Sequence, residues 1–321
     1  MKNMKKMIAL VLALVLCLAL VACGGGSADD VYTVGVVQLT QHVALDAATE
    51  GFVDALKAEL GDKVDIKVQN ASGDFNVCST LAAQFVAEEV DLIMANATPA
   101  LQATVSATKD IPVLGTSVTE YGVALEIANF SGTVGGNISG TSDLAPLADQ
   151  AAMVKEWFPN AKNVGLLYCS SEANSQYQVD VVKVELEKLG YTCKLYAFSD
   201  SNDLSAVCNT AAAESDVIYV PTDNTVADNT GLIDNICQPA KVPVIAGEQG
   251  VCSGCGVATL SIDYYDLGVA TGKMAAKILK GEANISEMPI EYAPEFTKKY
   301  NKAICDALNL TVPEGYIAIE G

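Results

Sequence analysis

Residues 31–68 read VYTVGVVQLTQHVALDAATEGFVDALKAELGDKVDIKV, an order of apolar runs from which the architecture follows. The apolar run at 31–37 predicts a strand, the helical spacing of apolar residues over 44–60 predicts a helix, and 64–68 predicts a second strand. Two strands separated by a helix of this length form a βαβ unit, so the strands are expected to be parallel.

The same alternation continues through the rest of the chain, with one interruption. Residues 130–143 are rich in Gly, Ser, Thr and Asn and have no periodicity, which predicts a crossing between two domains. Before it we expect further strands at 91–95 and 112–115 and helices at 77–89 and 99–109; after it we expect strands at 163–169, 192–198, 216–220, 243–247 and 257–262, helices at 144–158, 175–189, 203–214, 227–240 and 265–280, a short crossing strand at 289–292 and a last long helix at 297–309. The sequence therefore predicts an α/β fold of two doubly wound parallel-sheet lobes, with a ligand cleft where the carboxyl ends of their strands face each other.

The composition limits the possible functions. The 321 residues are 50% hydrophobic and carry a formal net charge of −20, which argues against disorder and against a nucleic-acid partner. All 19 basic residues are lysine, so an anionic ligand must be held without a guanidinium group. His42 is the single histidine, which excludes a three-histidine zinc site within one chain.

The N-terminus has the features of an export signal. Three lysines within residues 1–6 precede an apolar run at 8–20, which is shorter than a typical membrane span. The run ends in Leu-Val-Ala-Cys at 20–23, which resembles a bacterial lipobox. We therefore expect residues 1–22 to be a signal peptide, Cys23 to be lipidated and to anchor the protein outside the bacterial cell membrane, and 23–30 to be a flexible tether. An uncleaved anchor helix and an ordinary signal peptide are the alternatives.

Eight short motifs, in this order, resemble one known family. Together they are similar to the substrate-binding lipoproteins of ABC transporters, of the tryptophan/tyrosine type, over nearly the whole chain after residue 30. The motifs are TQHVALDAA at 40–48, NATPA at 96–100, TKDIPV at 108–113, GNISG at 136–140, SEANS at 171–175, YVPTDNTV at 219–226, DYYDLG at 263–268 and ILKGE at 278–282.

The resemblance implies a type I periplasmic-binding-protein fold. We expect one lobe of 31–140 with 263–290, a second of 141–262 with 291–321, and three hinge crossings near Asn137, Asp263 and Pro289. It further implies an extracytoplasmic solute-binding protein, with no catalytic activity, cofactor or metal. Such a protein captures a small polar solute, here an amino acid with an aromatic one favoured, and delivers it to the permease and ATPase subunits of an ABC importer. We expect a monomer.

Polar residues at the predicted strand ends are the candidates for the binding site. Asp223, after the strand at 216–220, would accept a hydrogen bond from a ligand ammonium, and the start of the helix at 175–189 would receive a carboxylate. Polar side chains of the first lobe would face the side chain of the ligand. The full set of candidates is Thr40, Gln41, His42, Thr98, Ser117, Ser171, Asn174, Ser175, Asp223, Asn224, Glu248 and Asp263.

Several of these candidates also have a purely structural interpretation. Asp223, Ser171, Asn174 and Ser175 can cap the helices that follow them. His42 can be a helix-entry residue that packs locally, and a catalytic role is not expected for it because no Ser/Asp constellation accompanies it.

A cysteine pair departs from the family pattern. Residues 251–256, VCSGCG, lie where relatives have a cysteine-free loop bordering the cleft, which puts the ligand's identity in doubt. Too few other ligands lie near Cys252 and Cys255 for a metal site, and the pair precedes a strand instead of opening a helix as in thioredoxin-like proteins. A local disulfide and two free thiols both remain open. Most of the other mature cysteines are expected to be small buried apolar residues; the six are Cys78, Cys169, Cys193, Cys208, Cys237 and Cys305.

Three other functions compete with an importer component. The same cleft could report a ligand to a membrane receptor, and neighbouring permease and ATPase genes would argue against that. A lipid-anchored hydrolase is disfavoured by the single histidine and the lack of a nucleophile elbow. A sugar or nucleoside binder on the same fold is disfavoured by the absence of arginine.

Overall fold

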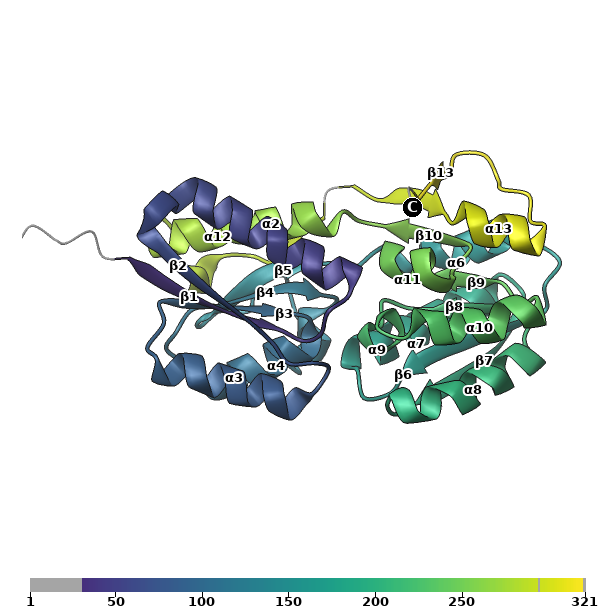
Figure 1. The fold of residues 1–321 in the computed structure, drawn as a ribbon, viewed down its shortest axis with the longest axis horizontal. Helices are drawn as coiled ribbons and strands as arrows, with labels where there is room; N and C mark the ends of the chain where they lie inside the picture. The colour runs from purple at the N-terminus through teal and green to yellow at the C-terminus, as the bar shows by residue number, and fades with distance from the viewer. Residues whose placement is uncertain (1–30, 294, 320–321) are drawn as a thin grey trace, which may run out of the picture.

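Two α/β lobes lie side by side in the computed structural model, which describes residues 31–293 and 295–319 (Figure 1). The first lobe is built on a six-stranded sheet in the order β11-β5-β4-β3-β1-β2, and all of its strand pairs are parallel. Its strands are β1 Tyr32–Gln38, β2 Val64–Asn70, β3 Leu92–Asn96, β4 Val113–Val118, β5 Ile138–Ser142 and β11 Glu291–Tyr292.

The second lobe is built on a seven-stranded sheet in the order β13-β12-β10-β9-β8-β6-β7. Its pairs are parallel except that β12 runs antiparallel to β10. Its strands are β6 Asn163–Cys169, β7 Thr192–Phe198, β8 Val217–Val220, β9 Val244–Ala246, β10 Ala258–Ser261, β12 Thr297–Tyr300 and β13 Ile317–Ala318.

Helices cover both faces of each sheet and form the hydrophobic cores against them (Figure 1). In the first lobe α2 and α12 lie on one face and α3 and α4 on the other; in the second lobe α6, α7 and α13 lie on one face and α8, α10 and α11 on the other. The helices are α2 Val43–Leu60, α3 Phe75–Ala87, α4 Thr98–Ala107, α5 Tyr121–Ala124, α6 Leu147–Trp157, α7 Ala173–Lys188, α8 Ser201–Glu214, α9 Asn224–Ala227, α10 Thr230–Ala240, α11 Gln249–Cys255, α12 Tyr264–Leu279 and α13 Lys302–Leu308, with short 3-10 turns at Gly61–Lys63 and Ile285–Glu287.

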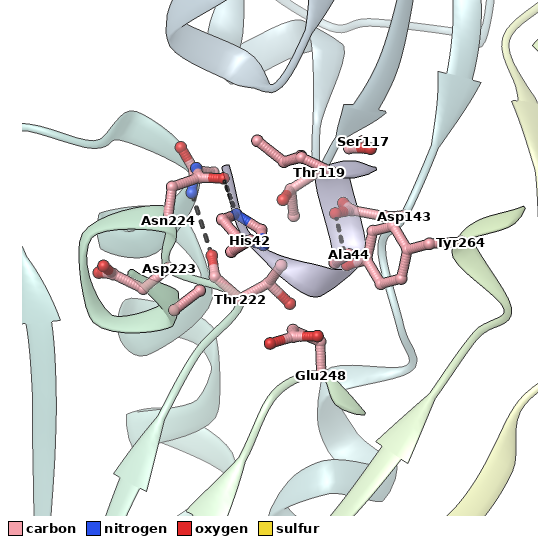
Figure 2. A pocket seen from close by; sticks show the side chains of 13 residues that line it. His42, Ala44, Ser117, Thr119, Asp143, Thr222, Asp223, Asn224, Glu248 and Tyr264 are labelled. Atoms are coloured by element: carbon pink, nitrogen blue, oxygen red, sulfur yellow. Dashed lines mark hydrogen bonds between the residues drawn. The ribbon is translucent and has the colours of Figure 1, made fainter. Parts of the chain in front are cut away.

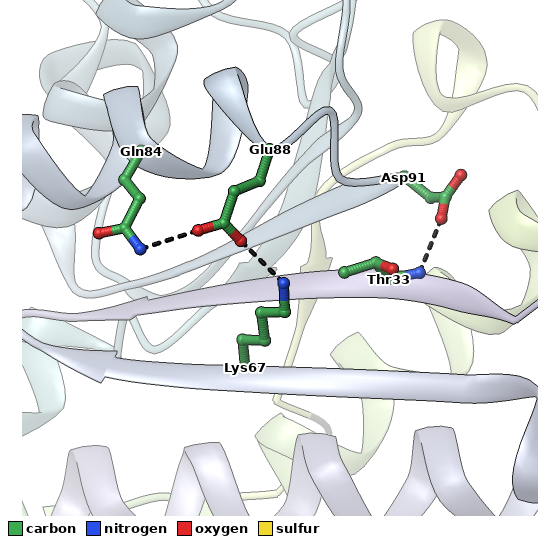
Figure 3. Close-up of polar contacts among 5 residues, drawn as sticks. All are labelled: Thr33, Lys67, Gln84, Glu88 and Asp91. Carbon is green, nitrogen blue, oxygen red and sulfur yellow. Dashed lines mark hydrogen bonds and ion pairs between the residues drawn. The ribbon is translucent and has the colours of Figure 1, made fainter.

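Helix α3 illustrates how local sequence fixes an element. It begins at Asp74, whose carboxylate accepts hydrogen bonds from the N–H groups of Asn76 and Val77. Beyond its last turn, Glu88 pairs with Lys67 of β2 at 2.8 Å and also accepts a hydrogen bond from Gln84 (Figure 3). These contacts fix the edge strand β2 to the helix that covers it.

Helices α2 and α12 approach each other closely because two glycines leave room for backbone contact. A Cβ atom on Gly268 would overlap the carbonyl oxygen of Ala48, and one on Gly51 would overlap that of Tyr265. These obstacles are backbone atoms, so the two helices would have to move apart to accept a larger residue.

We therefore expect Gly268→Ala to lower the free energy of unfolding by about 2–3 kcal/mol, measured by urea denaturation, because overpacking a rigid contact carries that cost. Gly231 in α10 is the matched control, since a Cβ atom added there would have no other atom within 4 Å. Gly231→Ala should leave stability unchanged or raise it by up to about 1 kcal/mol. Equal effects of the two substitutions would contradict the close-packing explanation.

The chain passes between the two sheets three times. It leaves the first sheet after Ser142 and after Tyr292, and it returns from the second sheet after Ser261. The first passage therefore follows β5 and lies a few residues later than the expected crossing near Asn137. The Gly/Ser/Thr-rich segment 130–143 contains this buried strand, whose small residues fit beside Gly115 and the hydroxyl of Tyr121.

Other sequence expectations need correction. The predicted long helix at 297–309 is wrong: the segment forms strand β12, which pairs with β10, and then α13, which begins where Asn301 accepts a hydrogen bond from Ile304. The predicted helix at 227–240 corresponds to α10, which begins at Thr230, and the separate short helix α9 precedes it. Cys252 and Cys255 lie in helix α11 and not in a loop, and both are buried free thiols.

Within the described part of the chain, every helix is too short or too polar to span a bilayer. The expected signal peptide at 1–22, the lipidated Cys23 and the tether at 23–30 lie outside the described residues.

Candidate functional site

A cavity lies between the lobes, where the carboxyl ends of strands from both sheets meet (Figure 2). The space not filled by atoms there is about 280 Å³, a part of which is open to solvent. In the first lobe the lining comes from the segments after β1 and β5 and from the end of β4 with the residue that follows it. In the second lobe it comes from the segments after β6, β8 and β9. Tyr264 comes from the start of α12. The lining residues are His42, Ala44, Leu45, Ser117, Thr119, Asp143, Asn174, Thr222, Asp223, Asn224, Ala227, Glu248 and Tyr264.

Hydrogen bonds join the two lobes across this cavity. His42 precedes α2, and its Nε2 lies 3.3 Å from Oδ1 of Asn224 in the second lobe (Figure 2). Nearby, the hydroxyl of Thr40 donates to Asp228 at 3.4 Å. Both contacts link the segment after β1 to the segment after β8, so they would break if the lobes separated.

Three buried carboxyl groups line the cavity, and no lysine lines it within the described residues. Burial raises the pKa of Asp143 to about 6, against the opposing effect of its hydrogen bond from Tyr264. Burial also raises the pKa of Asp223, reinforced by the nearby carboxylate of Glu172, and it raises the pKa of Glu248. Buried acidic groups with no lysine beside them favour a cationic ligand group.

The three carboxyl groups differ in what they can still bind. Asp223 accepts hydrogen bonds from the backbone N–H groups of Cys169 at 2.7 Å and Val226 at 2.9 Å, one on each oxygen. Glu248 likewise accepts from the N–H groups that begin α11. In Asp143, Oδ2 accepts from Tyr264 at 2.9 Å, but Oδ1 is buried without a partner in the described structure (Figure 2). Asp143 is therefore the carboxylate best able to accept a ligand hydrogen bond.

Three more unpartnered polar atoms belong to residues that line this cavity. They are Nδ1 of His42, Oγ of Ser117 and Oδ1 of Asn174, all buried without a partner among the described residues. Ser117 also has a left-handed backbone, with φ of 53°, at the irregularity between β4 and β5. Buried polar atoms are seldom left unpaired, and strained residues gather at binding sites, so both observations point to a polar ligand.

Glu172 organises the second lobe's side of the site. Its Oε2 accepts from the backbone N–H and the side-chain amide of Asn224 and from the amide of Asn174, at 2.6–3.1 Å. Its Oε1 accepts from the N–H and hydroxyl of Thr225, at 2.9 and 2.8 Å. One buried carboxylate thus positions two cavity-lining asparagines from different strand ends.

The structure brings together six of the twelve predicted site residues. His42, Ser117, Asn174, Asp223, Asn224 and Glu248 line the cavity.

The other six lie elsewhere. Thr40 and Ser171 line a wider cleft, of about 1060 Å³, which also reaches Asn224. Ser175 is buried beside Asn174, and Thr98 is buried at the start of α4 with an unpartnered hydroxyl. Gln41 and Asp263 are exposed and line other surface hollows.

Sequence reasoning missed Asp143, Thr119, Thr222, Tyr264 and Glu172. Asp143 directly follows β5, so it obeys the same strand-end rule as the residues that were found. Its strand was not recognised because Ile138–Ser142 contains one large apolar residue. Glu172 and Tyr264 lie inside motifs at 171–175 and 263–268, but nothing in the sequence alone distinguishes them from their neighbours.

The family of proteins described as ABC transporter substrate binding proteins matches residues 33–319. A tyrosine-binding protein of Clostridioides difficile is 34% identical over 280 residues, which cover 86% of this chain and 81% of that protein.

Two solved structures allow the lobe arrangement to be compared. A Streptococcus pneumonia ABC domain in complex with L-Trp has a TM-score of 0.85 at 35% identity, covering 90% of this chain and 99% of that one. The ligand-free, open structure of a Clostridium difficile substrate binding protein with adhesive properties has a TM-score of 0.69 at 36% identity, with the same coverage. At nearly equal identity, this chain therefore superposes more closely on the L-Trp complex than on the ligand-free, open structure.

Proposed function

This chain belongs to the ABC transporter substrate-binding protein family, and from that premise we propose that it captures an aromatic amino acid between two lobes of the type I periplasmic-binding-protein fold. The proteins of this family are extracytoplasmic and deliver a small solute to an ABC importer. The aromatic preference is supported by the tyrosine-binding relative and by the L-Trp complex.

The observation that carries the proposal is the set of buried acidic groups in the cavity. An α-ammonium needs hydrogen-bond acceptors and negative charge, and Asp143 offers an unpartnered oxygen beside two further buried carboxyl groups. The cavity also has apolar surface, from Ala44, Leu45, Ala227 and the ring of Tyr264, against which an aromatic side chain can pack.

The α-carboxylate would lie at the start of α2. Ala44 and Leu45 are in the first turn of this 18-residue helix and line the cavity. First-turn N–H groups have no partner within their own helix and carry a partial positive charge. The hydroxyl of Ser117 supplies a further donor, so the carboxylate can be held without arginine.

Calorimetry with matched ligands tests the proposal. L-tryptophan, L-tyrosine and L-phenylalanine should bind with micromolar or tighter affinity, and 3-(4-hydroxyphenyl)propionate, which lacks the ammonium, should bind at least about 30-fold more weakly than L-tyrosine. Tyramine, which lacks the carboxylate, tests the contribution of that group, and L-leucine, which lacks an aromatic ring, tests the contribution of the ring. Equal affinity for L-tyrosine and its desamino analogue would reject the ammonium site, and preference for L-leucine would reject the aromatic class.

Binding should strengthen as pH rises. The pKa of Asp143 is raised to about 6 in the folded, ligand-free protein, so Asp143 is protonated at pH 5 and largely ionised at pH 7. An ammonium binds the ionised form, and we therefore expect affinity to fall by about tenfold from pH 7 to pH 5. Stability of the ligand-free protein should change in the opposite direction. Because the folded state holds this proton to a higher pH than the unfolded chain, stability should fall between about pH 4 and pH 6.

Calorimetry across pH 5–8 checks the first trend, and urea denaturation of the ligand-free protein across pH 4–8 checks the second. Affinity that is flat over this range would show that no cavity carboxyl group changes its protonation on binding.

We also propose that residues 1–22 are a signal peptide and that a lipidated Cys23 anchors the protein beside its permease and ATPase partners. The basis is the Leu-Val-Ala-Cys sequence after the apolar run at 8–20. Cys23→Ala should abolish fatty-acid labelling and release the protein from the membrane fraction or leave an uncleaved precursor. A variant that still incorporates labelled fatty acid and sediments with membranes would refute the anchor.

A further inference from the structure

Two cysteines of the second lobe meet in its hydrophobic core. Cys208 of α8 and Cys237 of α10 are buried, and their sulfur atoms lie 3.8 Å apart. Both side chains belong to the cluster that packs these helices against one face of the sheet. Two thiols from different helices are thus in van der Waals contact, 29 residues apart in sequence.

We propose that Cys208 and Cys237 form a disulfide in the exported protein. Each thiol gives up its hydrogen and an S–S bond forms between the two sulfur atoms. The two electrons and two protons pass to the disulfide of an extracytoplasmic thiol oxidoreductase, which becomes a dithiol. Disulfides persist outside the cytoplasm, where proteins of this family work.

The surroundings of the other cysteines favour this pair. Cys169, Cys255 and Cys305 each donate their thiol hydrogen to a backbone carbonyl, those of Ser199, Val251 and Val257. Cys252 and Cys255 lie on one helix, α11, so a bond between them would not join separate elements of the lobe. The sulfur atoms of Cys208 and Cys237, 3.8 Å apart, have to approach to about 2 Å to form the bond.

The bond would close a loop that contains part of the ligand site. The segment between the two cysteines contains β8, α9 and the residues Thr222, Asp223 and Asn224 of the cavity. A cross-link between α8 and α10 closes this segment into a loop, which reduces the conformational freedom of the unfolded chain. Because both sulfur atoms are buried, the bond should form during folding and be slow to form in the folded, reduced protein.

Mass spectrometry of protein isolated from exporting cells tests the proposal. The protein is alkylated under denaturing conditions before any reductant is added, then digested. After cleavage at Glu214, we expect a cross-linked peptide pair containing Cys208 and Cys237, and a mass lower by two hydrogen atoms than that of the reduced chain. Full alkylation of both cysteines, or a cross-link between Cys252 and Cys255 in place of this one, would overturn the proposal.

Variants add a second measurement. Adding reductant should lower the melting temperature of the wild-type protein by about 5 °C or more, because a loop of this length is stabilised substantially by closure. Cys208→Ala should melt at or below the reduced wild type and show no further response to reductant. Cys78→Ala, which removes a buried thiol from α3 in the first lobe, should keep the full response. A Cys208→Ala protein that still responds to reductant would place the bond elsewhere.

Discussion

Asp143→Asn should weaken the binding of an aromatic amino acid by at least about 30-fold, because losing one partner of a buried charged pair costs about 2–5 kcal/mol. Asp143 is 4% exposed, and its Oδ1 is the unpartnered carboxylate oxygen of the cavity. Asparagine keeps the size of the side chain and an oxygen that can accept from Tyr264, so the loss isolates the charge. Calorimetry at pH 7 with the wild-type ligand gives the ratio of dissociation constants.

The Asp143→Asn variant should bind its ligand more weakly but should be more stable than the wild-type protein when no ligand is bound. Burial disfavours the ionised form of Asp143, as its raised pKa of about 6 indicates, so a neutral side chain should raise the melting temperature of the ligand-free protein at pH 7. Weaker binding combined with greater stability cannot come from misfolding. Asp263→Asn is the matched control, since Asp263 is an exposed cap of helix α12 outside the cavity. The affinity of this variant for the ligand should be unchanged. Unchanged affinity in Asp143→Asn would remove Asp143 from the site.

Hydrophobic alternation in the sequence predicted most of the architecture. Strands such as β1 and β6 are buried on both faces, so they read as apolar runs that local sequence reveals. Local sequence does not reveal a strand where packing requires small residues. Strand β5 is such a case, because it carries Ser139, Gly140 and Thr141 in close contact with its neighbours. The strand at 297–300 is a second case, because it is antiparallel and depends on pairing with β10 and not on local propensity.

The candidate site was predictable to the extent that it follows strand ends. His42, Ser117, Asp223 and Glu248 come after recognised strands, and all four line the cavity. The sequence could not show which of the three buried carboxyl groups is available to a ligand. Asp223 and Glu248 are committed to backbone N–H groups, which leaves Asp143 free, and that distinction depends on hydrogen bonds between residues distant in sequence.

Glu172→Ala should produce the largest loss of stability among these predictions, about 3–5 kcal/mol in the free energy of unfolding. Glu172 is 5% exposed and accepts hydrogen bonds from Asn174, Asn224 and Thr225. Alanine removes both acceptor oxygens and leaves several buried donors without partners, each of which costs about 1–3 kcal/mol unless water reaches it. Urea denaturation of the ligand-free protein measures the change.

Binding should weaken in Glu172→Ala as well, by about tenfold or more, because Asn174 and Asn224 lose the group that positions them at the cavity. Glu187→Ala is the matched control: Glu187 lies on α7, the helix that Glu172 precedes, and pairs with Lys183 at the surface, so neither stability nor affinity should change measurably. Glu172→Gln separates charge from shape, since it fills the same space but replaces one acceptor with an amide donor that faces the N–H groups. It should fall between wild type and alanine in stability. If Glu172→Ala unfolds at the wild-type urea concentration, the hydrogen-bond network around this carboxylate does not hold the second lobe's side of the site together.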